Sequence, residues 1–254
     1  MSSIDSEIHT LHDLPLGKIT VSGSSGEFIV IGKRKYYRDE LVSAFGGSLV
    51  PGLSPPPAYD FANPVPLGLC AFSFTTFVLS MYNAGANGVH VSNAVVGASC
   101  FYGGAIQLLA GVWDLILGNT FGGTALCSYG GFWLSFSAIN LESFGIIAAY
   151  GDDTVQLENA LGFYFIGWTL FTFMLVMCTV KSTLAFFSLF FSLFVTFLLL
   201  SIGKLTGSAG CITGAGVVGV ICSFIGWYNA FLGVANPQNS YVRPRVVPLP
   251  WRLK

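Results

Sequence analysis

The sequence predicts an all-α integral membrane protein with six transmembrane helices. Of its 254 residues, 53% are hydrophobic and only 9% are charged, compared with roughly 25% charged residues in a typical soluble domain. Very few of these charged residues lie between Phe61 and Asn236, and a soluble fold could not cover its surface with so few. We therefore expect this part of the chain to lie in a lipid bilayer.

Six segments are long enough to cross a hydrocarbon core, which takes roughly 20 apolar residues. They are residues 66–83, 93–117, 121–141, 160–180, 183–202 and 209–234. Six spans place the basic cluster of the N-terminal region, Lys181 and the basic C-terminal region on one side of the membrane, and Asp152, Asp153, Glu158 and Lys204 on the other. Because basic flanking residues favour the cytoplasmic side, we expect a multi-pass plasma-membrane protein with both termini in the cytoplasm.

The regions outside the spans differ from them in composition. We divide the chain into a cytoplasmic tail at residues 1–62, a six-helix transmembrane domain at 63–235 and a cytoplasmic tail at 236–254. The N-terminal tail carries a basic cluster of Lys33, Arg34, Lys35 and Arg38, and residues 37–45 can form a short amphipathic helix on the membrane surface, the alternative being a partly ordered tail. The C-terminal tail is rich in proline and arginine, which is typical of an extended segment.

The first span opens with Asn63, Pro64, Val65 and Pro66. Asn63 can cap the helix, and the prolines occupy early positions where a helix does not need the missing N–H groups. The free N–H donors and the positive dipole end of such a helix start can attract an anion. The same pattern also serves as an ordinary helix start without a ligand, so both interpretations stay open.

The last span carries small residues at a spacing that permits close helix contact. The pattern is Gly210-xxx-Gly214 followed by Ala215-xxx-Gly219. Small residues at this spacing let two helix backbones approach each other. The partner helix can belong to the same chain or to another chain.

The sequence offers no constellation typical of an enzyme. His9 and His12 lie in the tail, His90 lies in a short loop, and the spans hold hydroxyls and amides but almost no carboxylates. The six cysteines are scattered singly, without metal-ligand spacing, which favours packing roles. We therefore expect no catalysis, no cofactor and no metal ion. A net charge of −1 also argues against a nucleic-acid partner.

Asp114 is the one acid placed within a span. An ionisable side chain in the bilayer is costly and normally faces a cavity or a partner. Gln107 lies two helical turns earlier on roughly the same face, so that the two residues can line a polar track. Because Asp114 is close to the end of its span, a side chain that snorkels to water is the alternative.

Three spans carry aromatic and hydroxyl residues at helical spacing. The stripes are Phe72, Thr76 and Ser80; Tyr129, Trp133, Phe136 and Asn140; and Phe186, Phe190, Leu193 and Phe197. Such stripes are more often packing surfaces than pore linings. If they converge, however, they form a narrow hydrophobic waist flanked by hydroxyls, which suits a small solute and blocks ion leakage by dewetting.

Several motifs follow one another in a characteristic order, from about Asn63 to Phe231. They are residues 63–69, Phe101-Tyr102-Gly103-Gly104, Gly118-Asn119-Thr120-Phe121, residues 128–133 and the junction around Lys181. Together they resemble the acetate uptake transporter family, which includes bacterial succinate–acetate permeases and fungal acetate and ammonia transporter-type proteins. The tail sequence Arg38-Asp39-Glu40-Leu41 is similar to the fungal branch.

The resemblance implies a six-helix protomer in a hexameric ring, with one pathway per protomer for acetate, related small monocarboxylates or succinate. It places the family's constriction at Phe72, Tyr129 and Leu193, and the asparagine of the proline motif at Asn63. Asp114 stands where bacterial members often have glutamate.

The residues and the resemblance suggest one mechanism. The carboxylate of acetate is received near Asn63 and the hydroxyls of Thr75 and Thr76, while its methyl group passes the constriction. If a proton accompanies the substrate, Asp114 is the candidate to carry it, with Gln107 in the same polar track.

Two other functions stay open. A hydrophobic waist is equally suited to a channel for ammonia or another small neutral solute. A membrane nutrient sensor or scaffold would instead use the two tails as its working parts, and deletion of the tails would distinguish it from a transporter.

Overall fold

The structure is a computed structural model that describes residues 19–23, 25–44, 61–89, 91, 93–242 and 245–249. The chain forms two compact units, Met1–Asp60 and Phe61–Lys254. Each unit is described separately below. The predicted helix end at Phe45 and the three histidines lie outside the described residues.

The first unit contains a small antiparallel sheet. Strands β1 (Ile19–Ser22), β2 (Phe28–Ile31) and β3 (Arg34–Tyr37) lie in the order β1-β2-β3. Gly32 has a φ of 62° at the turn between β2 and β3, a left-handed conformation that glycine adopts without strain. On one face, the rings of Phe28 and Tyr37 lie 4.9 Å apart between centroids.

This sheet is not among the sequence-based expectations, which considered only a tail and a helix. Its strands have four residues each, too few to show a clear alternation of apolar and polar residues. Helix α2 (Arg38–Ala44) lies within the segment expected to be helical. Its position on a membrane surface stays a prediction.

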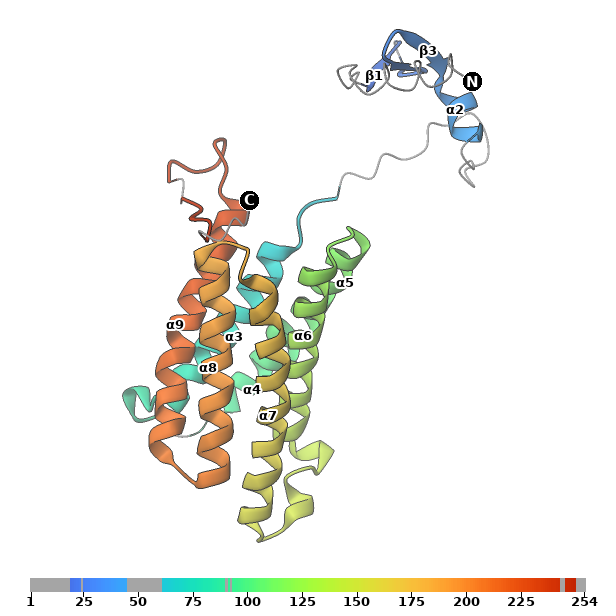
Figure 1. Cartoon of the computed structure of the whole chain (residues 1–254). Helices are drawn as coiled ribbons and strands as arrows, with labels where there is room; N and C mark the ends of the chain where they lie inside the picture. The colour runs from blue at the N-terminus through green and yellow to red at the C-terminus, as the bar shows by residue number, and fades with distance from the viewer. Residues whose placement is uncertain are drawn as a thin grey trace, which may run out of the picture. The chain divides into compact units, whose positions relative to one another are not determined.

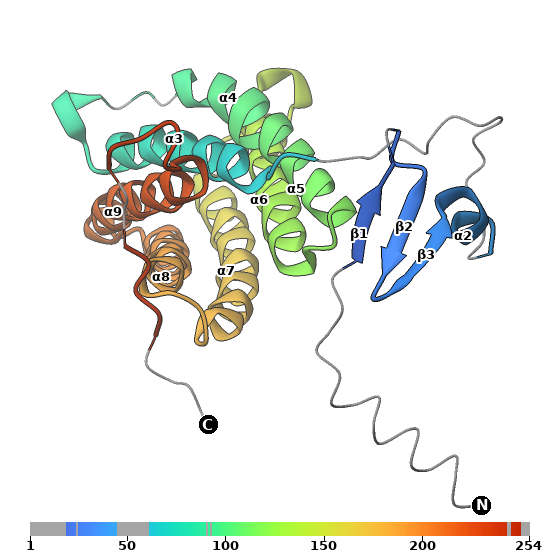
Figure 2. The same ribbon diagram turned by 90° about the horizontal axis from the view of Figure 1, so that it is seen from above.

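The second unit is a bundle of helices that run side by side along one axis (Figures 1 and 2). In chain order the principal helices are α3 (Val65–Asn83), α4 (Asn93–Cys100), α5 (Gln107–Ile116), α6 (Thr120–Asn140), α7 (Thr154–Thr179), α8 (Leu184–Thr206) and α9 (Ala209–Val234). Helix α3 packs against α9, α9 against α8, α8 against α7, and α5 against α6. Short helical turns η1 (Ala86–Gly88), η3 (Glu142–Phe144) and η4 (Ala148–Tyr150) lie in the connections.

The predicted second span is interrupted by the π-helical segment η2 (Phe101–Ile106), which joins α4 to α5. The two glycines of this segment explain the local geometry. Gly103 lies against Thr75 of α3, and Gly104 lies against Leu134 of α6. A side chain at either position would collide with the neighbouring helix, so the widened turn sits where the backbone approaches both neighbours.

Among the described residues, five helices are long and apolar enough to cross a membrane. They are α3, the continuous segment Asn93–Ile116, α7, α8 and α9. Helix α6 has 21 residues but does not belong to this group, because its glycines and serines lower its mean hydropathy. The structure is thus a mostly helical membrane protein, as the sequence predicts.

Helix α7 begins several residues before the predicted start at residue 160, and α8 ends after the predicted end at residue 202. At the start of α7, the Asp153 side chain accepts a hydrogen bond of 2.9 Å from the Gln156 N–H. One turn later, Glu158 forms an ion pair with Lys204 at the end of α8. A cap and an ion pair therefore extend both helices beyond their apolar cores.

Residues 245–249 are extended, and they pair with the loop between α7 and α8. The Leu184 N–H donates to the Val247 carbonyl over 2.8 Å, and the Leu249 N–H donates to the Ser182 carbonyl over 3.0 Å. The hydroxyl of Tyr228 on α9 also donates to the Arg245 carbonyl over 3.0 Å. This segment therefore lies at the end of the bundle where α8 begins.

Helix α9 meets α3 through its glycines, so the close contact expected from its small residues occurs within one chain. Gly216, Gly219 and Gly226 are buried on this face. A methyl group at Gly216 would collide with the backbone at Ser80 and Ala84. Gly214, in contrast, faces Leu199 at an ordinary contact distance of 3.7 Å.

We expect Gly216→Ala to lower the stability of the protein by about 1–3 kcal/mol, because the added methyl forces two helix backbones apart. Gly214→Ala is the matched control, and its higher helix propensity should leave stability unchanged or raise it by up to about 1 kcal/mol. Thermal unfolding of both variants in detergent measures the difference. Equal melting temperatures for the two variants would show that α3 and α9 are not in close backbone contact.

Candidate functional site: a solute pathway through the bundle

Three large side chains from three different helices meet in the centre of the bundle. Phe72 of α3, Tyr129 of α6 and Leu193 of α8 are all buried and line one small cavity. The ring centroids of Phe72 and Tyr129 lie 6.0 Å apart. The structure therefore brings together the three residues that the family resemblance places at the constriction, and we call them the waist.

Two chambers adjoin the waist, one on each side. The chamber toward the start of α3, which we call the Gln107 chamber, has a volume of about 20 Å³ and is lined by Leu69, Phe72, Gln107, Ala125, Leu126, Tyr129, Leu189, Phe190 and Leu193. The chamber toward the end of α3, which we call the Trp133 chamber, also measures about 20 Å³ and is lined by Phe72, Thr76, Leu79, Ser80, Asn83, Phe132, Trp133, Leu193, Thr196, Phe197 and Leu200. Phe72 and Leu193 are common to both and separate them.

Two wider spaces adjoin the Trp133 chamber in turn. A vestibule of about 180 Å³ shares Leu79, Asn83 and Leu200 with this chamber. A hollow of about 880 Å³ follows, which shares Ile139, Asn140 and Ile147 with the vestibule. The four spaces form one series through shared lining residues, and it ends at the waist and the Gln107 chamber.

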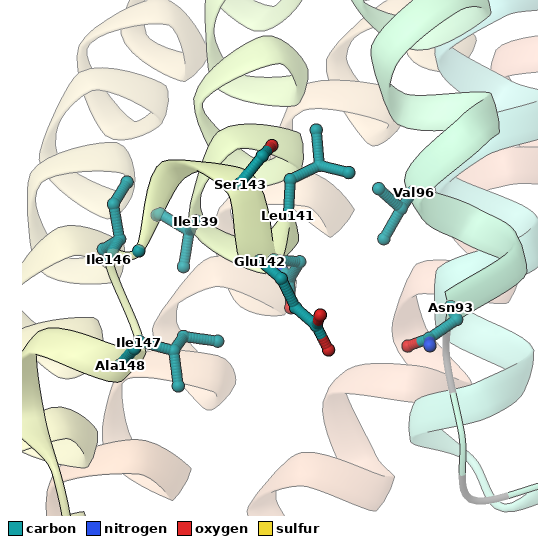
Figure 3. A pocket seen from close by; sticks show the side chains of 11 residues that line it. Asn93, Val96, Ile139, Leu141, Glu142, Ser143, Ile146, Ile147 and Ala148 are labelled. Carbon is teal, nitrogen blue, oxygen red and sulfur yellow. The ribbon is translucent and has the colours of Figure 1, made fainter.

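The hollow and the vestibule carry polar groups at the mouth of this series. In Figure 3 the side chains of Asn93 and Glu142 point toward each other across the hollow, from α4 and from η3. In the vestibule, the Lys204 ammonium lies 2.9 Å from the Glu158 carboxylate. From the sequence, Lys204 served only to assign the orientation of the chain in the membrane. The pattern that could have marked it as a site residue is a single cation at the end of an apolar helix.

Polar atoms without partners line both chambers. Gln107 is 1% exposed, and neither its amide nitrogen nor its amide oxygen has a hydrogen-bond partner. In the Trp133 chamber, the Thr76 hydroxyl and the Trp133 indole nitrogen are also buried without a partner. A buried polar group left without a hydrogen bond costs about 1–3 kcal/mol. Each chamber therefore offers hydrogen-bonding groups to a polar solute or a water molecule.

Tyr129 presents its ring rather than its hydroxyl to the waist. Its hydroxyl lies 3.0 Å from the Thr172 hydroxyl of α7. Its ring lies 5.7 Å from Phe171 and 6.4 Å from both Phe190 and Phe197. The hydrogen bond and the surrounding rings hold this side chain in one orientation, so it forms a rigid wall.

Asn63 and Thr75 are not brought to these chambers. Asn63 is exposed, and its side-chain oxygen accepts a hydrogen bond of 3.0 Å from the Val65 N–H at the start of α3. The Thr75 hydroxyl donates to the Ala71 carbonyl over 2.9 Å, and the side chain packs against Gly103. Of the three residues expected to receive the carboxylate, only Thr76 lines the series of cavities.

Asp114 is buried, and its carboxylate contacts a neighbouring side chain. It is 3% exposed, and its carboxylate accepts a hydrogen bond of 2.9 Å from the Asn119 amide. Asn119 in turn accepts from the Gly122 N–H over 3.0 Å and caps α6. Gln107 and Asp114 are both buried on α5, but only Gln107 lines a chamber.

Comparison with known proteins gives consistent matches. The sequence model described as the GPR1/FUN34/yaaH family matches residues 45–251. The chain is 58% identical to Ammonia transport outward protein 2 of Saccharomyces cerevisiae, over 92% of this chain and 83% of that protein. It is 41% identical to Acetate permease A of Emericella nidulans, over 84% and 76%.

A solved structure described as that of the bacterial acetate channel SatP matches with a TM-score of 0.63 and 38% identity. The match covers 71% of this chain and 96% of the bacterial chain. At this level of identity and coverage, the two chains share the fold of the helical unit.

We expect a coupling of about 1 kcal/mol between Tyr129→Phe and Thr172→Val, because each substitution removes the same buried hydrogen bond. Thermal unfolding of the two single variants and the double variant measures this coupling. Thr169→Val is the control partner, since the Thr169 hydroxyl donates to the Phe165 carbonyl of its own helix. Additive effects for both pairs would show that Tyr129 is not held by Thr172.

Proposed function

The chain belongs to the GPR1/FUN34/yaaH family, and from this premise we propose that it is a membrane transporter or channel for acetate and related small monocarboxylates, succinate among the further candidates. One relative is named an acetate permease, and the matching structure is that of an acetate channel. The observation that supports the proposal most strongly is the apolar waist of Phe72, Tyr129 and Leu193 between two chambers with unsatisfied polar groups.

The proposed topology has six spans, with both termini in the cytoplasm of a cell and the protein in the plasma membrane. Helix α6, with 21 residues, is about 31 Å long at 1.5 Å per residue, which matches the hydrocarbon core. Counting it as the sixth span returns the chain to the side on which α3 begins. The paired C-terminal segment at the start of α8 agrees with this arrangement.

We also propose a ring-shaped homo-hexamer, which the family resemblance implies, with one pathway in each protomer. Large apolar side chains on the outside of the bundle are available for lipid or for a second copy. Phe101, Phe163 and Leu170 are 71%, 68% and 65% exposed. The pathway itself lies within one chain, so transport does not require residues from a neighbouring protomer.

Passage follows from the order of the cavities. A bare carboxylate is costly in a bilayer, and at the vestibule the Lys204 ammonium, which is ion-paired with Glu158, can donate a hydrogen bond to it. The apolar waist then contacts the methyl group, and the unsatisfied Gln107 amide offers a donor beyond it.

The structure is closed, because chambers of about 20 Å³ hold about one water molecule each. Tyr129 is fixed by its hydrogen bond to Thr172 and the Leu193 side chain has no hydrogen-bonding group, so we assign the opening movement to Leu193.

Ammonia is the second candidate substrate. A relative of 58% identity is named an ammonia transport outward protein. The two chambers are also of the size of a single small neutral molecule. Ammonia would cross the waist without the cost of a buried charge.

We expect Leu193→Ala to admit propionate and butyrate, because truncation widens the waist by about three methyl-sized groups. Labelled-acid uptake into liposomes that contain the purified protein measures the size limit. Leu198→Ala on the same helix is the matched control, since Leu198 is 37% exposed. Uptake of acetate by both variants with an unchanged size limit would contradict the assignment of Leu193 to the waist.

We propose Asp114 as the proton-carrying group if transport is coupled to protons. Asp114→Asn keeps an oxygen to accept the Asn119 hydrogen bond, so the fold should be retained while the titrating group is lost. The expected result is acetate uptake with a weaker dependence on an inward proton gradient than that of the unmodified chain. An identical gradient dependence, in protein with an unchanged melting temperature, would remove Asp114 from this role.

A further inference from the structure

Trp133 is held in a fixed position while its polar atom lacks a partner. The side chain is 3% exposed. Its ring lies 4.9 Å from the Phe132 ring and 5.9 Å from the Phe136 ring. The indole nitrogen is only a donor, and it has no acceptor within hydrogen-bond distance. The ring is therefore packed as a hydrophobic residue, and its N–H remains available.

The Trp133 chamber offers donors but no negative charge. None of its lining residues is acidic. The Thr76 hydroxyl has no partner, whereas the Thr196 hydroxyl already donates to the Ser192 carbonyl over 2.9 Å. Once the chamber widens beyond its closed volume of about 20 Å³, a solute with acceptor oxygens and a small apolar part can accept from both free groups and pack against the aromatic rings. A carboxylate with a short alkyl chain has this chemistry.

The position of the Trp133 chamber shows where along the proposed pathway the Trp133 N–H and the Thr76 hydroxyl lie. The Trp133 chamber lies between the vestibule that contains Lys204 and the waist. Gln107 lines the chamber on the other side of the waist. A carboxylate that leaves the Lys204 vestibule therefore meets Trp133 and Thr76 before its alkyl group reaches Phe72 and Leu193.

We propose that the Trp133 N–H and the Thr76 hydroxyl form a carboxylate-binding station on the Lys204 side of the waist. This inference rests on the proposed function, because it assigns a binding role within the same pathway. The station replaces part of the hydration that the carboxylate loses in the bundle, and it orients the alkyl group toward the waist. Trp133 is thus a substrate-binding residue as well as a packing residue.

Uptake kinetics test the station. Trp133→Phe keeps an aromatic ring and removes the N–H, and a lost hydrogen bond to a charged group should raise the KM for acetate about tenfold. Thr76→Val should raise the KM in the same direction, and Thr76→Ser should restore it. Trp168→Phe is the matched control, since Trp168 lies in the same aromatic cluster but lines a separate surface pocket.

Indole resonances provide a readout that packing alone would not change. The chain contains five tryptophans, so ¹⁵N-indole labelling gives five N–H signals, and the signal missing in Trp133→Phe identifies that residue. Titration with sodium acetate should shift the Trp133 signal to a saturating value, whereas sodium chloride at equal ionic strength should not. This measurement does not depend on whether a variant transports.

The outcomes separate the two proposals. Absence of acetate uptake by the folded, unmodified chain would contradict the proposed function. Normal uptake together with an unmoved Trp133 signal and an unchanged KM in Trp133→Phe would overturn the station alone. If Trp133→Phe fails to fold, the Thr76 variants and the titration of the unmodified chain decide the question in the same way.

Discussion

The buried ring of Tyr129 sets the geometry around the proposed pathway. Its hydroxyl is bound to Thr172 of α7, while its ring contacts Phe72 of α3 and Phe190 and Phe197 of α8. One side chain of α6 therefore contacts three other helices. The waist and its closed state depend on this ring remaining in place, because it lines the Gln107 chamber beside Phe72 and Leu193, the two residues that separate the chambers.

Two kinds of helix contact hold Phe72 and Tyr129 in position. Helices α3 and α9 meet backbone to backbone through glycine, which fixes α3 and hence Phe72. Helix α6 meets α7 and α8 through large rings instead. Close glycine contacts leave little room for movement, whereas a ring-filled space can be enlarged by rotation of a single aliphatic side chain. This difference between glycine contacts and ring contacts explains how one bundle can be rigid at Phe72 and Tyr129 yet permit movement at Leu193.

Helical periodicity predicted the helices of the second unit and three stripes on them, and the family resemblance singled out Phe72, Tyr129 and Leu193 within those stripes. The stripes meet at these three residues, which line one cavity. Periodicity placed Thr76, and not Thr75, in the stripe with Phe72, because consecutive residues of a helix point in different directions, and the chamber is lined by Thr76 alone of the two. It also placed Trp133 in its stripe without showing that the indole N–H lacks an acceptor, which depends on neighbours from other helices.

The remaining differences have similar causes. The partner of Asp114 is Asn119 across a turn, and sequence spacing alone does not give the conformation of that turn. The π-helical segment at Phe101–Ile106 reflects contacts of Gly103 and Gly104 with two other helices. The three-stranded sheet is stabilised by pairing between segments that are individually too short to be recognised.

The most direct test of the central claim is acetate uptake by liposomes that contain either the unmodified chain or Leu193→Trp. The account predicts saturable uptake by the unmodified chain and its loss in the variant, because the larger ring fills the chambers that Leu193 lines beside Phe72. Undiminished uptake by a folded Leu193→Trp protein would show that acetate crosses by a route other than the waist.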